Sequence, residues 1–246
     1  MVNNKLFIVG IGPGNIEEMS RSAYNILNEV DVIVGYKTYL NLISDLIKEG
    51  QETYKSGMKQ EKERAEKAIE LAKKGKSVAI ISSGDPGVYG MAGLVFELID
   101  ERDYELEVEV VSGITAANAA AAILGAPLMH DYAVISLSDL LTPWKQIEKR
   151  LNKAAEADFI TVLYNPKSSK RTEQIKIARK IFLKNKSKDT PVGIVRNAGR
   201  ENEEKIITNL DKMLDQKIDM LSTVIIGNSE TYTAGNKIIT PRGYNL

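Results

Sequence analysis

The chain has 246 residues with 33 basic and 33 acidic side chains, so its formal net charge at neutral pH is zero. This balance argues against a general nucleic-acid binder, because such proteins carry a clear basic excess. There is no cysteine and one histidine, His130, which excludes disulfides and thiolate metal sites and disfavours an imidazole-rich one. We therefore expect no resident metal.

No apolar run has the length of a secretory core or a membrane span. The longest apolar stretch, residues 108–129, is interrupted by glycine, asparagine and proline. The sequence therefore predicts a cytoplasmic protein that neither enters a membrane nor binds nucleic acid.

Short β-branched runs alternate with helical patterns over the first half of the chain. Strands are predicted at residues 6–9, 32–34, 78–81 and 108–111. Helices are predicted at residues 17–30, 61–74 and 115–124, the last of them rich in alanine. Continuous apolar strands separated by helices are typical of a mainly parallel sheet that is covered on both faces.

The sequence Gly125-Ala126-Pro127 ends the alanine-rich helix, and we expect the domain boundary there. The second half predicts helices at residues 147–155 and 172–183 and strands at residues 159–163, 192–195, 205–208 and 223–226. The short spacing of the last two strands favours some antiparallel pairing. The predicted fold is two α/β domains in series, 1–127 with a mainly parallel sheet and 128–246 with a mixed sheet.

The loop Gly84-Asp85-Pro86-Gly87-Val88-Tyr89-Gly90 follows the strand predicted at residues 78–81. Glycine lets the backbone approach a ligand closely, and open α/β sheets bind ligands beyond the carboxyl ends of their strands. Asp85 is suited to accept hydrogen bonds from an ammonium group or a ribose. A second strand-end loop at residues 112–115 suggests a shared pocket, although a structural turn remains an alternative reading of each loop.

The first loop, Gly10-Ile11-Gly12-Pro13-Gly14, fails the dinucleotide-binding fingerprint. Asn15 stands where the third glycine should be, and Asp31 precedes the second strand instead of ending it. Pro13 also lacks the amide that a pyrophosphate would use. These departures argue against a nicotinamide enzyme and leave a tight structural turn as the alternative.

Polar residues in later loops are further candidates. His130 is the only side chain whose ordinary pKa lies near neutral pH, although a lone histidine is more often structural. Asn165 lies between Tyr164 and Pro166 at the end of a predicted strand, where a simple turn is the alternative. Loop arginines can bind carboxylates through two hydrogen bonds; they are Arg171, Arg196, Arg200 and Arg242.

Taken in order, the motifs of nearly the whole chain resemble those of the tetrapyrrole methylase family of S-adenosylmethionine-dependent methyltransferases. The general motifs are those at residues 9–14, 84–87 and 112–116. The more specific motifs are those at residues 125–131, 135–144, 164–166, 197–200, 226–229 and 240–244. The resemblance is strongest to the branch that methylates carbon 17 of a precorrin-3B or cobalt-factor III type macrocycle, with ring contraction, in cobalamin biosynthesis.

The resemblance implies a homodimer of two-domain subunits that bind the methyl donor, S-adenosylmethionine, in a cleft between the domains. The implied donor-binding residues are Pro13, Ser83, Gly84, Asp85, Val88, Thr115, Ala116 and Asn165. Those implied for the tetrapyrrole are Gly12 and the arginines Arg171, Arg200 and Arg242, with Arg196 as a further cation. Cobalt would enter only as part of the substrate.

Ring contraction requires proton transfer, and His130 is our candidate catalytic residue, ahead of Asp131, Ser136 and Ser138. The sequence leaves open whether the macrocycle is metal-free or cobalt-loaded. A methylase of another precorrin intermediate is an alternative function. A nucleotide-binding oxidoreductase and a non-catalytic tetrapyrrole carrier are the alternatives from other classes.

Overall fold

A computed structural model describes residues 5–245 and divides the chain into two compact units, Met1–Ala116 and Ala117–Leu246. Two α/β units are as predicted, but the boundary lies before the alanine-rich helix α5 (Ala116–Leu124) and not after Pro127. The reason is packing: Ala117, Ala120 and Leu124 are buried in a cluster with strand residues of the second unit. The helix therefore belongs to the core of the second unit.

The first unit is built on a five-stranded parallel sheet in the order β3-β2-β4-β1-β5. Its strands are β1 (Lys5–Gly10), β2 (Val32–Tyr36), β3 (Glu52–Ser56), β4 (Val78–Ser82) and β5 (Glu107–Val111). Four of them were predicted. The fifth, β3, was missed because it is a largely exposed edge strand with the polar sequence Glu-Thr-Tyr-Lys-Ser.

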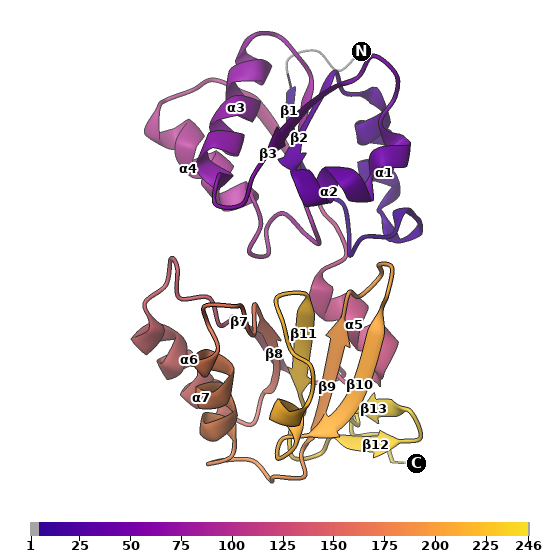
Figure 1. The fold of residues 1–246 in the computed structure, drawn as a ribbon, viewed down its shortest axis with the longest axis vertical. Helices are drawn as coiled ribbons and strands as arrows, with labels where there is room; N and C mark the ends of the chain where they lie inside the picture. Colours follow the sequence, from indigo (N-terminus) through magenta and orange to yellow (C-terminus); the bar gives the residue numbers. More distant parts are fainter. Residues whose placement is uncertain (1–4, 246) are drawn as a thin grey trace. The chain divides into compact units, whose positions relative to one another are not determined.

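Helices cover both faces of this sheet (Figure 1). They are α1 (Arg21–Glu29), α2 (Lys37–Leu42), α3 (Glu61–Lys73) and α4 (Ala92–Glu101). Side chains alternate along β1, so that Leu6 and Ile8 pack with α3 and α4, while Phe7 and Val9 pack with α1 and α2. This two-sided burial explains why the central strands β1, β2 and β4 are continuously apolar.

The helix predicted over residues 17–30 is shorter than expected. A single 3-10 turn, Ile16–Glu18, comes first, and α1 begins only at Arg21. The cause is Ser20, whose side-chain oxygen accepts a hydrogen bond from the Ala23 amide at 3.2 Å and caps the helix.

The second unit contains a mixed five-stranded sheet in the order β10-β9-β11-β8-β7. The strands are β7 (Tyr132–Ser136), β8 (Ile160–Tyr164), β9 (Pro191–Arg196), β10 (Glu204–Asn209) and β11 (Ser222–Ile226). A small sheet adds β6 (Gly125–Ala126), β12 (Tyr232–Ala234) and β13 (Lys237–Ile239). The expected antiparallel pairing is present, and β7, which lies beside β8, was not predicted.

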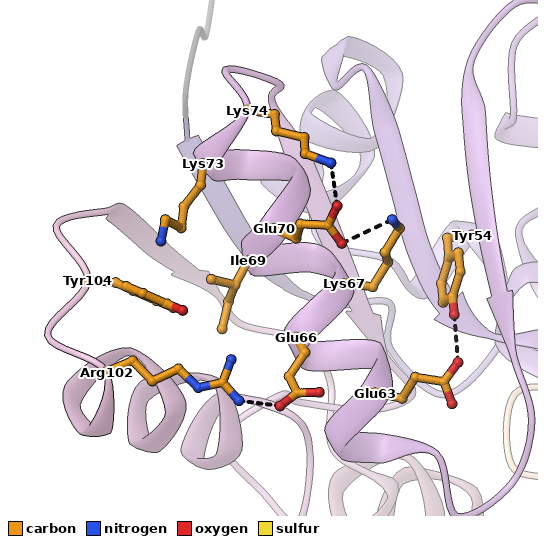
Figure 2. Close-up of a pocket in the computed structure, with 10 residues that line it drawn as sticks. All are labelled: Tyr54, Glu63, Glu66, Lys67, Ile69, Glu70, Lys73, Lys74, Arg102 and Tyr104. Carbon is orange, nitrogen blue, oxygen red and sulfur yellow. Dashed lines mark hydrogen bonds and ion pairs between the residues drawn. The ribbon is translucent and has the colours of Figure 1, made fainter.

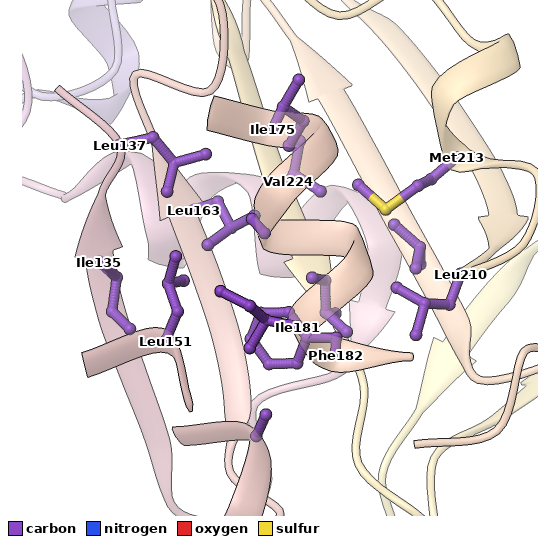
Figure 3. Packing of buried hydrophobic residues seen from close by; sticks show 14 of the residues in the cluster. Ile135, Leu137, Leu151, Leu163, Ile175, Ile181, Phe182, Leu210, Met213 and Val224 are labelled. Atoms are coloured by element: carbon purple, nitrogen blue, oxygen red, sulfur yellow. The ribbon is translucent and has the colours of Figure 1, made fainter. Parts of the chain in front are cut away.

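Two helices, α6 (Trp144–Glu156) and α7 (Glu173–Phe182), cover one face of the mixed sheet. Figure 3 shows Phe182 of α7 close to Leu151 and Leu163, all three fully buried. On the other face, α5 and Ile238 of β13 pack against the strands. Within residues 5–245, no helix is both long enough and apolar enough to cross a membrane.

Strand direction decides which loops of this unit lie together. Strands β8 and β9 are both antiparallel to β11, and β7 is parallel to β8. The carboxyl ends of β7, β8 and β9 therefore lie on one side, which we call the carboxyl edge of the second sheet. Residues that precede these strands lie on the opposite edge.

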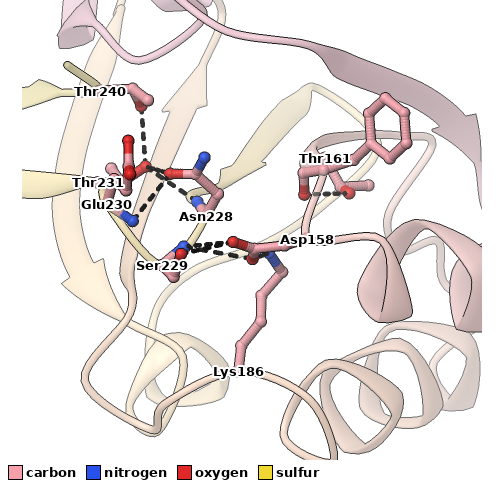
Figure 4. Close-up of polar contacts among 9 residues, drawn as sticks. Asp158, Thr161, Lys186, Asn228, Ser229, Glu230, Thr231 and Thr240 are labelled. Atoms are coloured by element: carbon pink, nitrogen blue, oxygen red, sulfur yellow. Dashed lines mark hydrogen bonds and ion pairs between the residues drawn. The ribbon is translucent and has the colours of Figure 1, made fainter. Parts of the chain in front are cut away.

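A polar network centred on Asp158 closes that opposite edge (Figure 4). The Asp158 carboxylate accepts hydrogen bonds from the Ser229 hydroxyl at 2.6 Å and from the buried Lys186 ammonium group. Burial raises the pKa of Asp158, but the bonds from Lys186 and Ser229 outweigh it and hold the pKa below its ordinary value. The network joins the loop before β8 to the loops that follow α7 and β11.

Candidate functional site

Three loops meet at the carboxyl ends of β1, β4 and β5, which are neighbours in the first sheet. After β1 and β4, Gly12 and Gly84 form an antiparallel bridge, with N···O distances of 3.1 and 2.7 Å. Both glycines have positive φ, +72° and +70°, a conformation that side chains disfavour. The first two loops are thus joined by their backbones.

Close approach of main chain excludes side chains at this junction. A Cβ atom on Gly113 would lie 2.2 Å from the Gly84 carbonyl oxygen, and one on Gly10 would lie 2.6 Å from the same atom. Only glycine fits at these two positions. The junction of the three loops is therefore made of backbone, and it lies at the carboxyl ends of the strands, where an α/β sheet binds ligands.

Asp85 ties the second loop to the third. One carboxylate oxygen accepts a hydrogen bond from the Gly87 amide at 2.8 Å, and the other accepts one from the Gly113 amide at 3.0 Å. The sequence suggested a carboxylate waiting for a ligand, whereas the structure shows one already engaged in organising its loops. Each oxygen keeps a second lone pair for a ligand donor.

The predicted residues of the first unit all lie in these three loops or at the start of α5. They are Gly12, Pro13, Ser83, Gly84, Asp85, Val88, Thr115 and Ala116. The structure therefore brings them to one edge of one sheet, as the strand-end argument anticipated.

In the second unit, Asn165 is the centre of a polar cluster at the carboxyl edge. It has a left-handed backbone with φ of +49°, and its side-chain amide donates to the Ser136 hydroxyl at 2.9 Å. Its carbonyl oxygen accepts a hydrogen bond from Arg171 at 2.8 Å. Arg171 also contacts the Ser138 hydroxyl at 3.5 Å. Two predicted residues, Asn165 and Arg171, are thus in direct contact.

Arg171 is a buried cation without an acidic partner. Arg171 is 8% exposed, and its side-chain Nε atom has no hydrogen-bond partner. Among residues 5–245, no carboxylate forms an ion pair with it. A buried charge without compensation is costly, so an anion at this position would stabilise the cluster.

Two further arginines lie on the same edge, Arg196 as the last residue of β9 and Arg200 in the loop after it. Arg200 lies in the loop after the strand, where its amide donates to the Asn197 carbonyl. Arg196 is paired with Asp219 at 2.7 Å, and this hydrogen bond raises the pKa of the arginine. The charge of Arg196 is therefore matched internally, which makes Arg196 a weaker candidate for a ligand.

His130 and Arg242 lie away from the Asn165 cluster, and their predicted roles stay predictions. His130 precedes β7, and its ring nitrogen Nδ1 is 3.8 Å from the exposed Asp131 carboxylate. Arg242 is exposed and follows Thr240, which is bound to Pro127 on the opposite edge. Strand β7, which is five residues long and spans roughly 16 Å, lies between His130 and the carboxyl edge. His130 was chosen from the sequence for the ordinary pKa of histidine. The sequence did not show how β7 pairs with β8, so it did not show on which edge of the sheet His130 lies.

The hollow over α3 in the first unit is not a site of this kind (Figure 2). Its charged groups pair with one another: Lys67 with Glu70 at 3.1 Å and Arg102 with Glu66. The Tyr54 hydroxyl donates to Glu63 at 2.7 Å. In the described part of the chain, no group of three or more histidine or acidic residues has the geometry for a metal ion.

One residue near the site was missed by sequence reasoning. The hydroxyl of Tyr164, the last residue of β8, accepts a hydrogen bond from the Ala117 amide at 2.7 Å. Its place before Asn165 and Pro166 was visible in the sequence, but nothing in the spacing linked it to α5.

Comparison with known proteins agrees with the motifs. The family model for tetrapyrrole (corrin/porphyrin) methylases matches residues 5–214. The probable cobalt-factor III C(17)-methyltransferase of Salmonella typhimurium is 49% identical over 241 residues, which cover 98% of this chain and 100% of that protein. The cobalt-factor III methyltransferase of Priestia megaterium is 50% identical, and this chain spans 46% of its length.

The comparison of folds agrees with the comparison of sequences. The crystal structure of the methyltransferase CobJ matches with a TM-score of 0.91 and 34% identity, covering 96% of this chain and 99% of that one. The predicted fold class and the predicted family are both confirmed. On the family model, the relatives and the shared fold, this chain belongs to the tetrapyrrole methylase family.

Proposed function

We propose that this chain uses S-adenosylmethionine to methylate carbon 17 of a precorrin-3B or cobalt-factor III type tetrapyrrole, with ring contraction, in cobalamin biosynthesis. The observation that carries the proposal is the backbone junction of three glycine loops at the carboxyl edge of a parallel sheet, in a chain of this family. The names of the two relatives favour a cobalt-loaded macrocycle.

The residues at the junction suit the methyl donor. When bound, S-adenosylmethionine supplies a methyl group on a sulfonium that is already a strong electrophile. The free lone pairs of Asp85 suit ribose hydroxyls or an ammonium group, and the glycine backbone leaves room for a close ligand. We assign donor binding to Pro13, Ser83, Gly84, Asp85, Val88, Thr115, Ala116 and Asn165.

Methyl transfer of this kind needs positioning and exclusion of water more than it needs an acid or a base. The loops of the first unit fix the donor, and Gly12 lies in the loop we assign to the tetrapyrrole as well. Arg171 and Arg200 bind acetate or propionate groups of the substrate. Burial of Arg171 without an acidic partner supports this role.

Ring contraction also requires a proton to move. The hydroxyls of Ser136 and Ser138 lie in the cluster around Asn165, so we assign them this role in place of His130.

The resemblance to the family also supports a homodimer that works in the cytoplasm. Light scattering on the purified chain measures its oligomeric state, and a monomer at micromolar concentration would contradict the proposed homodimer.

A single-turnover assay tests the proposed function. The protein is mixed with methyl-labelled S-adenosylmethionine and either metal-free or cobalt-loaded tetrapyrrole, and product mass and absorbance are followed. We expect one labelled methyl group per macrocycle, with the spectral change of ring contraction, for the cobalt-loaded substrate. Binding of the macrocycle without transfer of label would favour a carrier, and no binding of donor or product would refute the proposal.

A further inference from the structure

Tyr164 joins two segments of the second unit that lie far apart in the sequence. It ends β8, and its hydroxyl accepts a hydrogen bond from the Ala117 amide in the first turn of α5, at 2.7 Å. Amides in the first turn of a helix have no partner within the helix. Ala117 is 2% exposed, so the Tyr164 hydroxyl is the group that satisfies this buried donor.

The tyrosine is itself held in place along its whole length. Its carbonyl oxygen accepts a hydrogen bond from the Leu137 amide at 2.9 Å, and its ring packs against the cluster that contains the α5 alanines. Because Tyr164 is held at its backbone carbonyl and at its hydroxyl, it fixes the distance between β8 and α5. The start of α5 is therefore set by the end of β8.

Both ends of this link adjoin residues assigned to the methyl donor. Thr115 and Ala116 immediately precede Ala117, and Asn165 immediately follows Tyr164. We infer that the Tyr164 hydroxyl is a positioning group for donor binding, which aligns the first turn of α5 with the Asn165 turn. This inference rests on the proposed function, because it takes those residues as donor contacts.

Tyr164→Phe removes the hydroxyl and keeps the packed ring. We expect the dissociation constant for S-adenosylhomocysteine, measured by titration calorimetry, to rise about tenfold, because a buried amide loses its acceptor. The KM for the tetrapyrrole at saturating donor should stay at the wild-type value. Tyr132→Phe in the neighbouring strand β7 is the matched control, since its ring is exposed and no hydrogen bond of its hydroxyl ties it to α5.

Thermal melting separates positioning from a purely structural role. If Tyr164→Phe lowers the melting temperature but binds S-adenosylhomocysteine as tightly as wild type, the inference is wrong. Should the variant not fold, hydrogen exchange at the Ala117 amide of the wild-type chain gives a second test. We expect S-adenosylhomocysteine to slow that exchange, and an unchanged rate would overturn the inference. Failure of the wild-type chain to bind S-adenosylhomocysteine would count against the proposed function and, with it, this inference.

Discussion

Replacing Asp85 by alanine tests whether one carboxylate organises the methyl-donor site. The side chain holds the Gly87 amide at 2.8 Å and the Gly113 amide at 3.0 Å, so both hydrogen bonds are lost together. A hydrogen bond to a charged group contributes roughly 1.5–3 kcal/mol, and partial exposure here favours the low end or less. With about 1 kcal/mol for each bond, the loops lose about 2 kcal/mol of organisation.

That loss predicts a rise of about thirtyfold in the dissociation constant for S-adenosylhomocysteine. Asp85→Asn keeps one acceptor oxygen, so it should raise the constant by only about fivefold. Titration calorimetry measures both values, and circular dichroism checks that each variant is folded. Asp100→Ala is the matched control, because Asp100 is exposed on α4 away from the loops. Equal affinity of Asp85→Ala and wild type would refute the reasoning.

The remaining predictions concern packing, placement and pH. Gly113→Ala should abolish donor binding, because the new Cβ would lie 2.2 Å from a carbonyl oxygen, whereas Gly93→Ala, in open space on α4, should raise stability by about 0.5–1 kcal/mol in thermal melts. His130→Ala should leave the rates of methylation and contraction within about twofold of wild type, and loss of either step in a stopped assay would restore His130 as a catalytic residue. Asp158→Asn should lower the free energy of unfolding by about 1 kcal/mol at neutral pH, after allowance for solvent screening. Since the folded-state pKa of Asp158 is lowered, its stabilisation is present above about pH 4 and is lost as the pH falls through the folded-state value, so melting curves of wild type and variant should converge in acid. A gap in melting temperature that persists in acid would contradict this.

Apolar continuity and glycine placement made the first sheet and its loops predictable. Strands β1, β2 and β4 are buried on both faces, so each is a short apolar run that can be read from the sequence. The loops that we propose for the donor were chosen by the rule that ligands bind beyond the carboxyl ends of such strands. Strand β3 escaped because an exposed edge strand needs no apolar residues.

The second unit was harder, because its organisation depends on pairing across long stretches of sequence. Helix α5 is small and apolar on most sides, so its sequence does not say which sheet it packs on. The sequence placed Asn165 at the end of a predicted strand but placed His130 beside none, because β7, which lies parallel to β8, was not predicted. That register puts His130 at the start of one strand and Asn165 at the end of its neighbour, on opposite edges.

The backbone junction of Gly12, Gly84 and Gly113 also limits how the enzyme can be engineered. Designers usually enlarge a pocket for a bulkier alkyl donor by trimming side chains, but this junction has none to trim. Room for an analogue has to come from neighbouring side chains in the same loops, of which Tyr89 and Ile114 are exposed. A library for donors with larger transferable groups should therefore vary those two positions and leave the glycines unchanged.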